Sequence, residues 1–123
     1  MKTLNATDEK DLLLNLRDGS HAAFECLYGQ YKEHVVGHLL RLFRSPDLAQ
    51  EVAQDTFVAV WEQRESINTD KSFKSYLFTI ASNKAYSLFR RAAHDAQLRV
   101  YLQPIITEGV SQVEDYMLQK ENQ

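Results

Sequence analysis

The chain has 123 residues, of which 44% are hydrophobic and 25% are charged, and its formal net charge is −3. These values are typical of one soluble globular domain, and they exclude a uniformly basic protein that coats nucleic acid. The single cysteine, Cys26, allows no internal disulfide, and no apolar stretch approaches the ~20 residues that span a bilayer. We therefore expect a cytoplasmic domain without membrane insertion.

Two helices are expected in the first part of the chain. Thr7 or Asp8 can cap the first, which extends to about Arg17, and Asp8 and Glu9 lie where the helix dipole favours acids. Gly19 suits a left-handed position after this helix, and Ser20 suits the N-cap of the next one. The second helix extends to about residue 43 or 44 and is expected to be the central packing helix. Its apolar stripe consists of Phe24, Leu27, Tyr28, Tyr31, Val35, Leu39 and Leu42.

The segment Ser45-Pro46-Asp47 is the clearest helix start in the sequence. Serine can cap the first turn, proline loses no hydrogen bond there, and aspartate faces the positive end of the helix dipole. The third helix is expected to end near Arg64, and a polar, turn-rich connection follows at residues 66–71. The apolar stripe of this helix consists of Leu48, Val52, Phe57, Val60 and Trp61.

A fourth helix is expected from residue 72 to 91, with Ser72 as its N-cap. Residues 92–103 either extend this helix or form another short one, which Pro104 ends. No segment shows the sustained alternation of a strand. The expected fold is all-α, a compact four-helix bundle with a weakly structured C-terminal tail. The apolar stripe of the fourth helix consists of Phe73, Leu77, Ile80, Ala81 and Leu88.

Charge divides the third and fourth helices into two segments of opposite sign. Residues 45–66 contain five acids and one base, a balance of −4, whereas residues 71–91 contain five bases and no acid, a balance of +5. Two adjacent segments of opposite sign indicate two different partner surfaces. The acids are Asp47, Glu51, Asp55, Glu62 and Glu65, and the bases are Lys71, Lys74, Lys84, Arg90 and Arg91.

Tyr76, Asn83 and Tyr86 lie among the bases of the fourth helix. Cations, flat rings and an amide on one helix are typical of a surface that binds a nucleic-acid strand. The alternative is a solvated amphipathic helix that happens to be basic.

The sequence contains no constellation that indicates catalysis. Its four glycines are isolated, so no glycine-rich phosphate loop is present. His34 and His38 are spaced to share a metal ion, but no third ligand is placed by spacing, and solvated or core-edge histidines are the favoured interpretation. Cys26, beside Phe24 and Leu27, is expected to pack as a small hydrophobic side chain. We therefore expect no enzyme, no metal, no cofactor and no small-molecule substrate.

Three blocks occur in order across about residues 10–92. They read DLLLNLRDGSHAAFECLYGQY, SPDLAQEVAQDTFVAVWEQRESI and SFKSYLFTIASNKAYSLFRR. Together they resemble region two of the extracytoplasmic-function sigma factors, the group IV sigma subunits of bacterial RNA polymerase. The resemblance implies a transcription-initiation subunit without catalytic activity of its own.

In that family the acidic helix binds the clamp helices of the RNA polymerase β′ subunit, and the following loop and helix open and read the minus-ten promoter element. The resemblance therefore implies core RNA polymerase and the single non-template DNA strand as partners, together with an anti-sigma factor. The polymerase-binding candidates are Glu51, Gln54, Asp55, Val58 and Glu62. The DNA-binding candidates are Asn68, Thr69, Lys71, Ser72, Lys74, Tyr76, Asn83, Lys84, Arg90 and Arg91.

Within these sets the roles are expected to differ. Residues 67–72 form the wall of a base pocket, Asn83 reads a base edge, and Tyr76 supplies a ring near the melting junction. The alternative is that Asn83 bonds helix backbone and Tyr76 belongs to the hydrophobic core. Phe57 and Trp61 match the family motif and are assigned mainly to the hydrophobic core. The cations assigned to DNA phosphates are Lys74, Lys84, Arg90 and Arg91.

The chain also departs from the family pattern. Ile67 stands in a loop where the family often has a glycine and an aromatic residue, and Tyr76 stands where tryptophan is commonest. The base preference is therefore not transferred. Residues 1–95 are expected to form the region-two domain and residues 96–123 a linker or tail towards a missing second domain, which reads the minus-35 element. The chain would then be a fragment or a one-domain variant. The rival interpretation is a helical interaction module whose basic helix binds an acidic partner.

Overall fold

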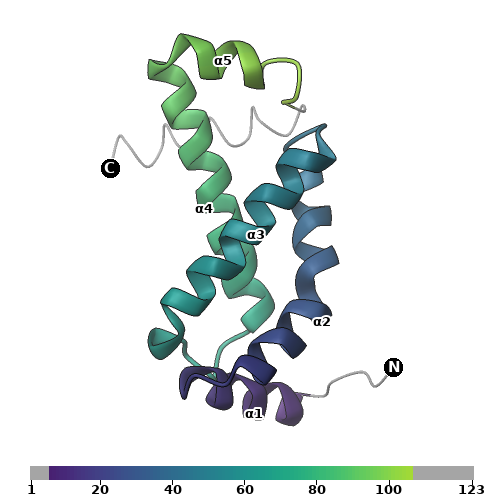
Figure 1. The fold of residues 1–123 in the computed structure, drawn as a ribbon, viewed down its shortest axis with the longest axis vertical. Helices are drawn as coiled ribbons and strands as arrows, with labels where there is room; N and C mark the ends of the chain where they lie inside the picture. Colours follow the sequence, from purple (N-terminus) through teal and green to yellow (C-terminus); the bar gives the residue numbers. More distant parts are fainter. Residues whose placement is uncertain (1–5, 107–123) are drawn as a thin grey trace.

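The computed structural model describes residues 6–106 as five α-helices and one short 3-10 helix (Figure 1). Within that range no β-strand occurs, apart from an isolated bridge between Phe43 and Ile106. The all-α prediction is confirmed, and what was expected of residues 107–123 lies outside the described residues. The elements are α1 (Ala6–Arg17), α2 (His21–Leu40), α3 (Pro46–Glu62), η1 (Arg64–Ser66), α4 (Phe73–His94) and α5 (Ala96–Leu102).

Helices α2, α3 and α4 pack together along the long axis, while α1 crosses one end and α5 crosses the other (Figure 1). The apolar stripes predicted for these helices form one contiguous core. Alanines occupy the buried positions of α3 at Ala49 and Ala53 and of α4 at Ala81 and Ala85. Small side chains at these positions let helix backbones approach closely. None of the described helices is long and apolar enough to cross a membrane.

Capping hydrogen bonds confirm the predicted starts of α2, α3 and α4, whereas α1 begins at Ala6, before the predicted caps Thr7 and Asp8. The hydroxyl oxygen of each capping serine accepts a backbone N–H from the first turn of its helix, as an N-cap requires. Gly19 has φ +93°, the left-handed conformation that glycine adopts without steric cost. The three bonds run from Ala23 N–H to Ser20 (3.1 Å), from Leu48 N–H to Ser45 (3.2 Å) and from Ser75 N–H to Ser72 (3.2 Å).

Helix α2 ends at Leu40, three to four residues earlier than predicted. The chain turns there because Phe43 enters the core, where its ring lies 5.6 Å from that of Phe89. The Arg44 N–H donates to the carbonyl of Ile105, which joins this turn to the segment after α5.

The prediction that Cys26 packs as a small hydrophobic side chain is wrong, because its side chain is exposed.

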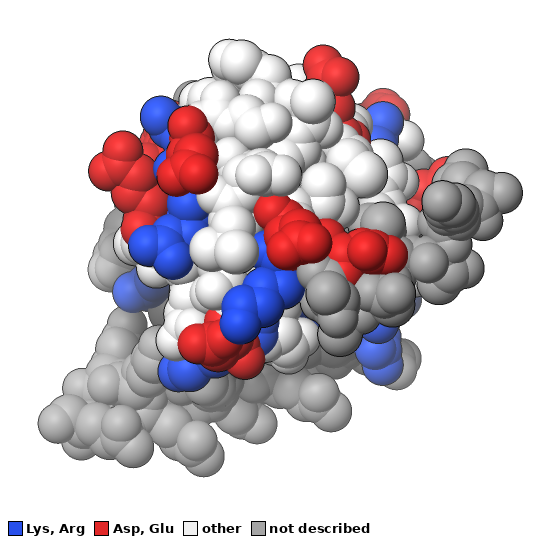
Figure 2. Space-filling view, turned by 90° about the horizontal axis from the view of Figure 1, so that it is seen from below, with Lys and Arg blue, Asp and Glu red and all other residues white. Residues whose placement is uncertain are grey.

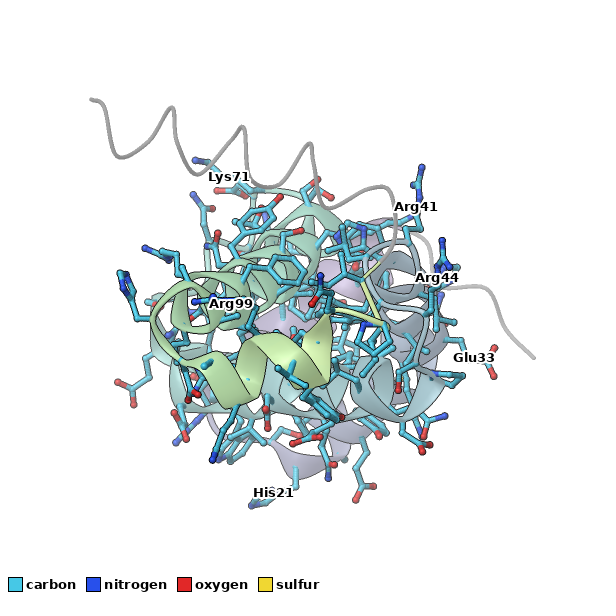
Figure 3. The ribbon with its side chains drawn as sticks, turned by 90° about the horizontal axis from the view of Figure 1, so that it is seen from above. His21, Glu33, Arg41, Arg44, Lys71 and Arg99 are labelled. Atoms are coloured by element: carbon cyan, nitrogen blue, oxygen red, sulfur yellow. The ribbon has the colours of Figure 1, made fainter. Side chains whose placement is uncertain are left out.

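The sequence left open whether residues 92–103 extend the fourth helix or form another short one. The structure has a separate short helix, α5. Asp95 caps it and accepts N–H bonds from Gln97 (3.0 Å) and Leu98 (3.1 Å). Figure 3 labels Arg99 of α5 in a view from above the bundle. Arg99 donates to the carbonyls of Ala92 (3.1 Å) and Ala93 (2.9 Å) in the last turn of α4. Leu102 is fully buried, so α5 belongs to the same packed unit as the other helices.

His38 lies at the edge of the core, between α2 and α4. Its Nε2 is 2.8 Å from the Ser82 hydroxyl, and its ring stacks on Phe78 with 4.6 Å between centroids. Burial, and to a lesser extent the charge of Arg41, hold the pKa of His38 below its usual value of 6.5. His34, one turn earlier, is exposed, and the described residues contain no group of three or more side chains that could hold a metal ion.

We expect the free energy of unfolding to fall as the pH drops from about 7.5 towards 5. A lowered pKa means that the folded chain favours the neutral ring, so this stability is present above the unfolded pKa and is lost as the pH falls towards the folded value. His38→Gln should flatten the dependence, whereas His34→Gln should retain it. Urea unfolding at several pH values measures this. Equal slopes for the two variants would exclude His38 as the cause.

Candidate functional site

The predicted polymerase-binding residues share one exposed face of α3. All five are exposed, and their three- and four-residue spacing places them along one side of the helix. Val58, an apolar side chain among these polar residues, is 48% exposed. We name this set the α3 face; it consists of Glu51, Gln54, Asp55, Val58 and Glu62.

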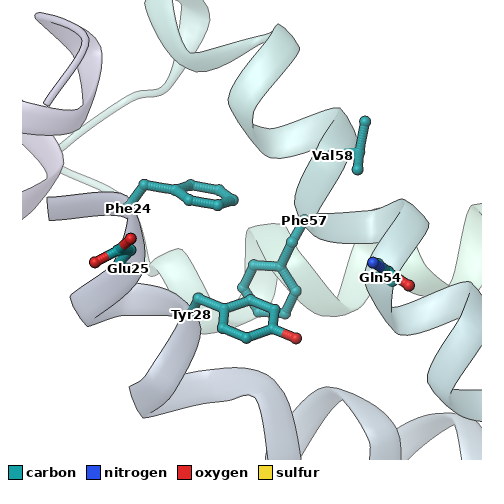
Figure 4. Close-up of a pocket in the computed structure, with 6 residues that line it drawn as sticks. All are labelled: Phe24, Glu25, Tyr28, Gln54, Phe57 and Val58. Atoms are coloured by element: carbon teal, nitrogen blue, oxygen red, sulfur yellow. The ribbon is translucent and has the colours of Figure 1, made fainter. Parts of the chain in front are cut away.

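An apolar hollow of about 210 Å³ lies beside the α3 face, between α2 and α3 (Figure 4). Gln54 and Val58 line one side, and Phe24 and Tyr28 of α2 line the other. The Phe57 ring at the back meets the Tyr28 ring edge-on, with 4.9 Å between centroids. From the sequence, Phe24 and Tyr28 are expected only in the packing stripe. In the structure both are half-buried, and the sequence pattern does not reveal this partial exposure.

Trp61 lies at the edge of the core. Its ring stacks on His21 at 4.6 Å, and the Arg64 guanidinium carbon lies 4.3 Å from the ring centroid. The assignment to the core is confirmed for Phe57, which is buried, and only in part for Trp61, which is half-buried. The Arg64 Nη1 also donates to the Trp61 carbonyl (3.0 Å), which gives this carbonyl in the last turn of α3 a hydrogen-bond partner.

A second hollow of about 210 Å³ lies where the loop after η1 meets the start of α4. We name it the loop pocket. Tyr76 lines this pocket and is half-buried. Its hydroxyl is buried and has no hydrogen-bond partner among the described residues, and burial raises its pKa. An unpaired buried hydroxyl costs stability. The lining residues are Ile67, Asn68, Lys71, Ser72, Phe73, Ser75, Tyr76 and Thr79.

The loop is held in shape by its own polar groups. The Asn68 side-chain oxygen accepts the Asp70 N–H (2.9 Å), and the Lys71 N–H donates to the Asn68 carbonyl (3.2 Å). Lys10 of α1 forms an ion pair with Asp70 at 3.0 Å. Acidic and basic groups are interspersed on this end of the molecule (Figure 2). The amide nitrogen of Asn68 makes no such bond within the described loop.

The DNA-binding candidates do not form one continuous surface. Asn68, Lys71, Ser72 and Tyr76 line the loop pocket, and Thr69 lies in the same loop. The ammonium of Lys74 lies 5.5 Å from the Phe78 ring, whose other contact is His38 of α2. Lys84 and Arg91 line a different groove, between α3 and α4.

Asn83 and Arg90 are exposed farther along α4. Asn83 lies one helical turn beyond Thr79 and does not line the loop pocket. Its side chain makes no hydrogen bond to the described residues, so the alternative in which it bonds helix backbone has no support in this geometry. Tyr76 is half-buried, and its ring lies 6.1 Å from that of Phe73, so it contributes to packing as well as to the pocket.

Comparison with known proteins gives one matching family. The family model for sigma-70 region 2 matches residues 27–94, which is more than half of the chain. The RNA polymerase sigma factor CarQ of Myxococcus xanthus is 36% identical over 78 residues, which cover 63% of this chain and 45% of CarQ. The chain thus spans less than half the length of this relative.

Two solved structures share the fold. One is an engineered region 2 of sigmaE, determined by NMR in complex with GTAAAA, with 23% identity and a TM-score of 0.65 over 76% of this chain and 95% of that one. The other is CnrH in complex with the cytosolic domain of CnrY, with 26% identity and a TM-score of 0.57 over 80% of this chain and 64% of that one. Sequence and fold therefore agree, and the chain belongs to the sigma-70 region 2 family, as its resemblance to extracytoplasmic-function sigma factors predicts.

Proposed function

We propose that this chain is the part of a sigma factor that binds core RNA polymerase and holds an unpaired base of the non-template promoter strand. The observation that carries the proposal is the loop pocket, lined by the half-buried Tyr76 and by the cation Lys71. We assign no reaction to the chain and propose that it acts by binding polymerase and the promoter strand.

A base pocket has to offset the cost of removing a base from its stack, which is a few kcal/mol. Stacking on an aromatic ring contributes ~1–3 kcal/mol per base, and the half-buried Tyr76 supplies a ring at this site. The Ser75 hydroxyl and the amide nitrogen of Asn68 are exposed at the pocket and can bond polar atoms of the base. Lys71 can hold the adjoining phosphate. Asn83, one turn away, is proposed to contact the next nucleotide along α4.

The α3 face and the neighbouring hollow are proposed as the polymerase surface. Acidic side chains steer a basic partner towards the face, and an apolar centre supplies most of the affinity in interfaces of this kind. Val58 and the rings of Phe24 and Tyr28 provide that centre. An anti-sigma factor is proposed to compete for this surface, and both partners would place the working chain in the cytoplasm.

We propose that the packed domain extends at least to residue 106. The sequence favoured a boundary at residue 95. Leu102 is fully buried, and Ile105 and Ile106 pack against the core, so the packed unit continues beyond that point. The rival interaction module is less favoured, because the described cations of α4 lie on different sides of the helix and offer an acidic partner no single basic face.

Asp55→Lys tests the polymerase surface. We expect affinity for bacterial core RNA polymerase to fall at least about tenfold, because a repulsive charge replaces an attractive one inside the α3 face. Stability should change by less than ~1 kcal/mol, since Asp55 is exposed. Fluorescence anisotropy with labelled chain measures the affinity, and thermal unfolding measures the stability.

The matched control is Glu33→Lys, which makes the same change in charge. Glu33 projects from α2 on another side of the bundle (Figure 3). Its affinity for polymerase should stay within about twofold of the unchanged chain. Equal losses for both variants would show that only net charge matters and would remove the α3 face from the proposal.

A further inference from the structure

His38 joins α2 to α4 through contacts that the proposed site does not include. Its ring stacks on Phe78 with 4.6 Å between centroids and 16° between planes, and its Nε2 lies 2.8 Å from the Ser82 hydroxyl. Lys74, one turn before Phe78, places its ammonium 5.5 Å from the centre of the same ring. We name this surface the α2–α4 edge; it consists of His38, Arg41, Lys74, Phe78 and Ser82.

Positive charge dominates the α2–α4 edge. The shared contact with Phe78 places the Lys74 ammonium within about 10 Å of the His38 ring, which is the Debye length at 0.1 M salt. Arg41 is exposed and lies close enough for its charge to help hold the pKa of His38 below the usual value. Residues 71–94 contain no acid, so the α4 side of this edge carries no negative side chain.

The other titratable groups near this edge belong to α1 and α2. His34, one turn before His38, is exposed. Glu9 of α1 accepts a hydrogen bond from the Tyr31 hydroxyl, and Tyr31 lies about 10 Å along the α2 axis from His38. Glu33 differs from His38 by about 140° around α2 and therefore points to another side. The described charges that face His38 from α2 and α4 are thus positive.

A neutral imidazole beside two cations is a group that can take up a proton when an anion arrives. Burial and the charge of Arg41 favour the neutral ring in the free chain. Within the described residues, the His38 side chain uses only Nε2 for hydrogen bonding, which leaves Nδ1 for a ligand. A phosphate between Arg41 and Lys74 would offset their charge and would accept a charge-assisted hydrogen bond from the protonated ring.

The α2–α4 edge also continues from the loop pocket. Lys71 lines that pocket, and Lys74 follows about one turn later, at the start of α4. Lys71 and Arg41 project from the same side of the bundle, opposite His21 (Figure 3). A strand with one base in the loop pocket therefore has further cations along this side to hold its phosphates.

We propose that the α2–α4 edge binds a phosphate of the strand that leaves the loop pocket, and that His38 takes up a proton when it does. Lys74 and Arg41 supply permanent positive charge, and protonated His38 adds a third cation. Because the bound state then holds more protons than the free chain, the strand binds more tightly as the pH falls from about 8 to 6. The inference rests on the proposed function, to which it adds a pH-dependent contact from α2.

The test of proton uptake is the affinity of the 123-residue chain for a labelled, randomised 12-nucleotide single DNA strand at pH 8 and pH 6. We expect the unchanged chain to bind about three- to tenfold more tightly at pH 6, at constant salt. His38→Gln retains a side chain that can bond Ser82 but cannot become charged, and its gain should be less than about twofold. His34→Gln should retain the pH dependence. Thermal unfolding at both pH values verifies that each variant is folded.

A pair of exposed cations tests the phosphate site without disturbing the core. Lys74→Gln with Arg41→Gln should weaken strand binding at pH 6 at least about fivefold and should remove most of the pH dependence, because no phosphate is then held beside His38. Arg17→Gln with Lys32→Gln is the matched control, since Lys32 lies over the Tyr28 ring on the side of α2 that faces α3. This pair makes the same change in charge and should lose less than about twofold.

Three results would overturn the inference: affinity of the unchanged chain that does not depend on pH, the full gain in His38→Gln, or equal losses in the two cation pairs. If the free chain binds too weakly to measure, the same variants are compared as complexes with core polymerase. A strand that binds without any contribution from the α2–α4 edge would refute this site and leave the loop pocket in place. No strand binding by the chain or by its polymerase complex would refute both proposals.

Discussion

Replacing Phe43 by alanine is expected to lower the free energy of unfolding by about 3–5 kcal/mol. Phe43 is 0% exposed and lies where the turn after α2 meets α4 and the segment after α5. Its ring packs against Phe89, and its backbone pairs with Ile106, so the cavity would also loosen the end of the bundle that α5 covers. Urea unfolding followed by circular dichroism measures the change.

Leu40→Ala is the matched control for this prediction. Leu40 is close by at the end of α2, but it is 40% exposed. Its truncation should cost less than about 1 kcal/mol, because little apolar surface leaves water when it folds. Comparable losses in the two variants would contradict the placement of Phe43 in the core.

Filling the loop pocket is expected to abolish most of the affinity for a promoter strand. Ser75 lines the pocket and its side chain is exposed, so Ser75→Trp can place a large ring there without disturbing the core. The complex of this variant with core polymerase should bind the non-template strand at least about tenfold more weakly, because the ~1–3 kcal/mol from stacking one base is lost. Polymerase binding and thermal stability should remain close to those of the unchanged chain.

Ser75→Ala separates the filling of the pocket from the loss of the hydroxyl. This variant removes one possible hydrogen bond but leaves the space open, so its affinity for the strand should fall by less than about fivefold. Competition binding with labelled oligonucleotides measures both variants. An unchanged affinity in Ser75→Trp would remove the loop pocket from the proposed site.

Local chemistry in the sequence was enough to predict the helices and most of the core. Ser20, Ser45 and Ser72 cap helices because a hydroxyl in that position satisfies a free amide whatever surrounds it. The α3 face could be predicted because it depends on the helical spacing and the charge of its residues, and both can be read from one segment of the sequence.

The misses share a different cause, because they depend on what the rest of the fold places nearby. Cys26 is adjacent to Leu27 in the sequence, but the two differ by about 100° around the helix, and only Leu27 faces the core. Helix α2 ends early because Phe43 finds a buried position against α4. The opposing walls of the α3–α4 groove could not be predicted from either segment alone, since the packing angle of two helices brings them together.

The central claim is that the chain and core RNA polymerase together hold an unpaired promoter base in the loop pocket. Selection of short strands from a random single-stranded DNA library by the chain–polymerase complex tests this most directly. We predict that the complex enriches one short motif, that polymerase alone enriches none, and that Ser75→Trp loses the motif while still binding polymerase. Failure of the chain to bind core polymerase, or enrichment of no motif by a complex that does form, would contradict the account.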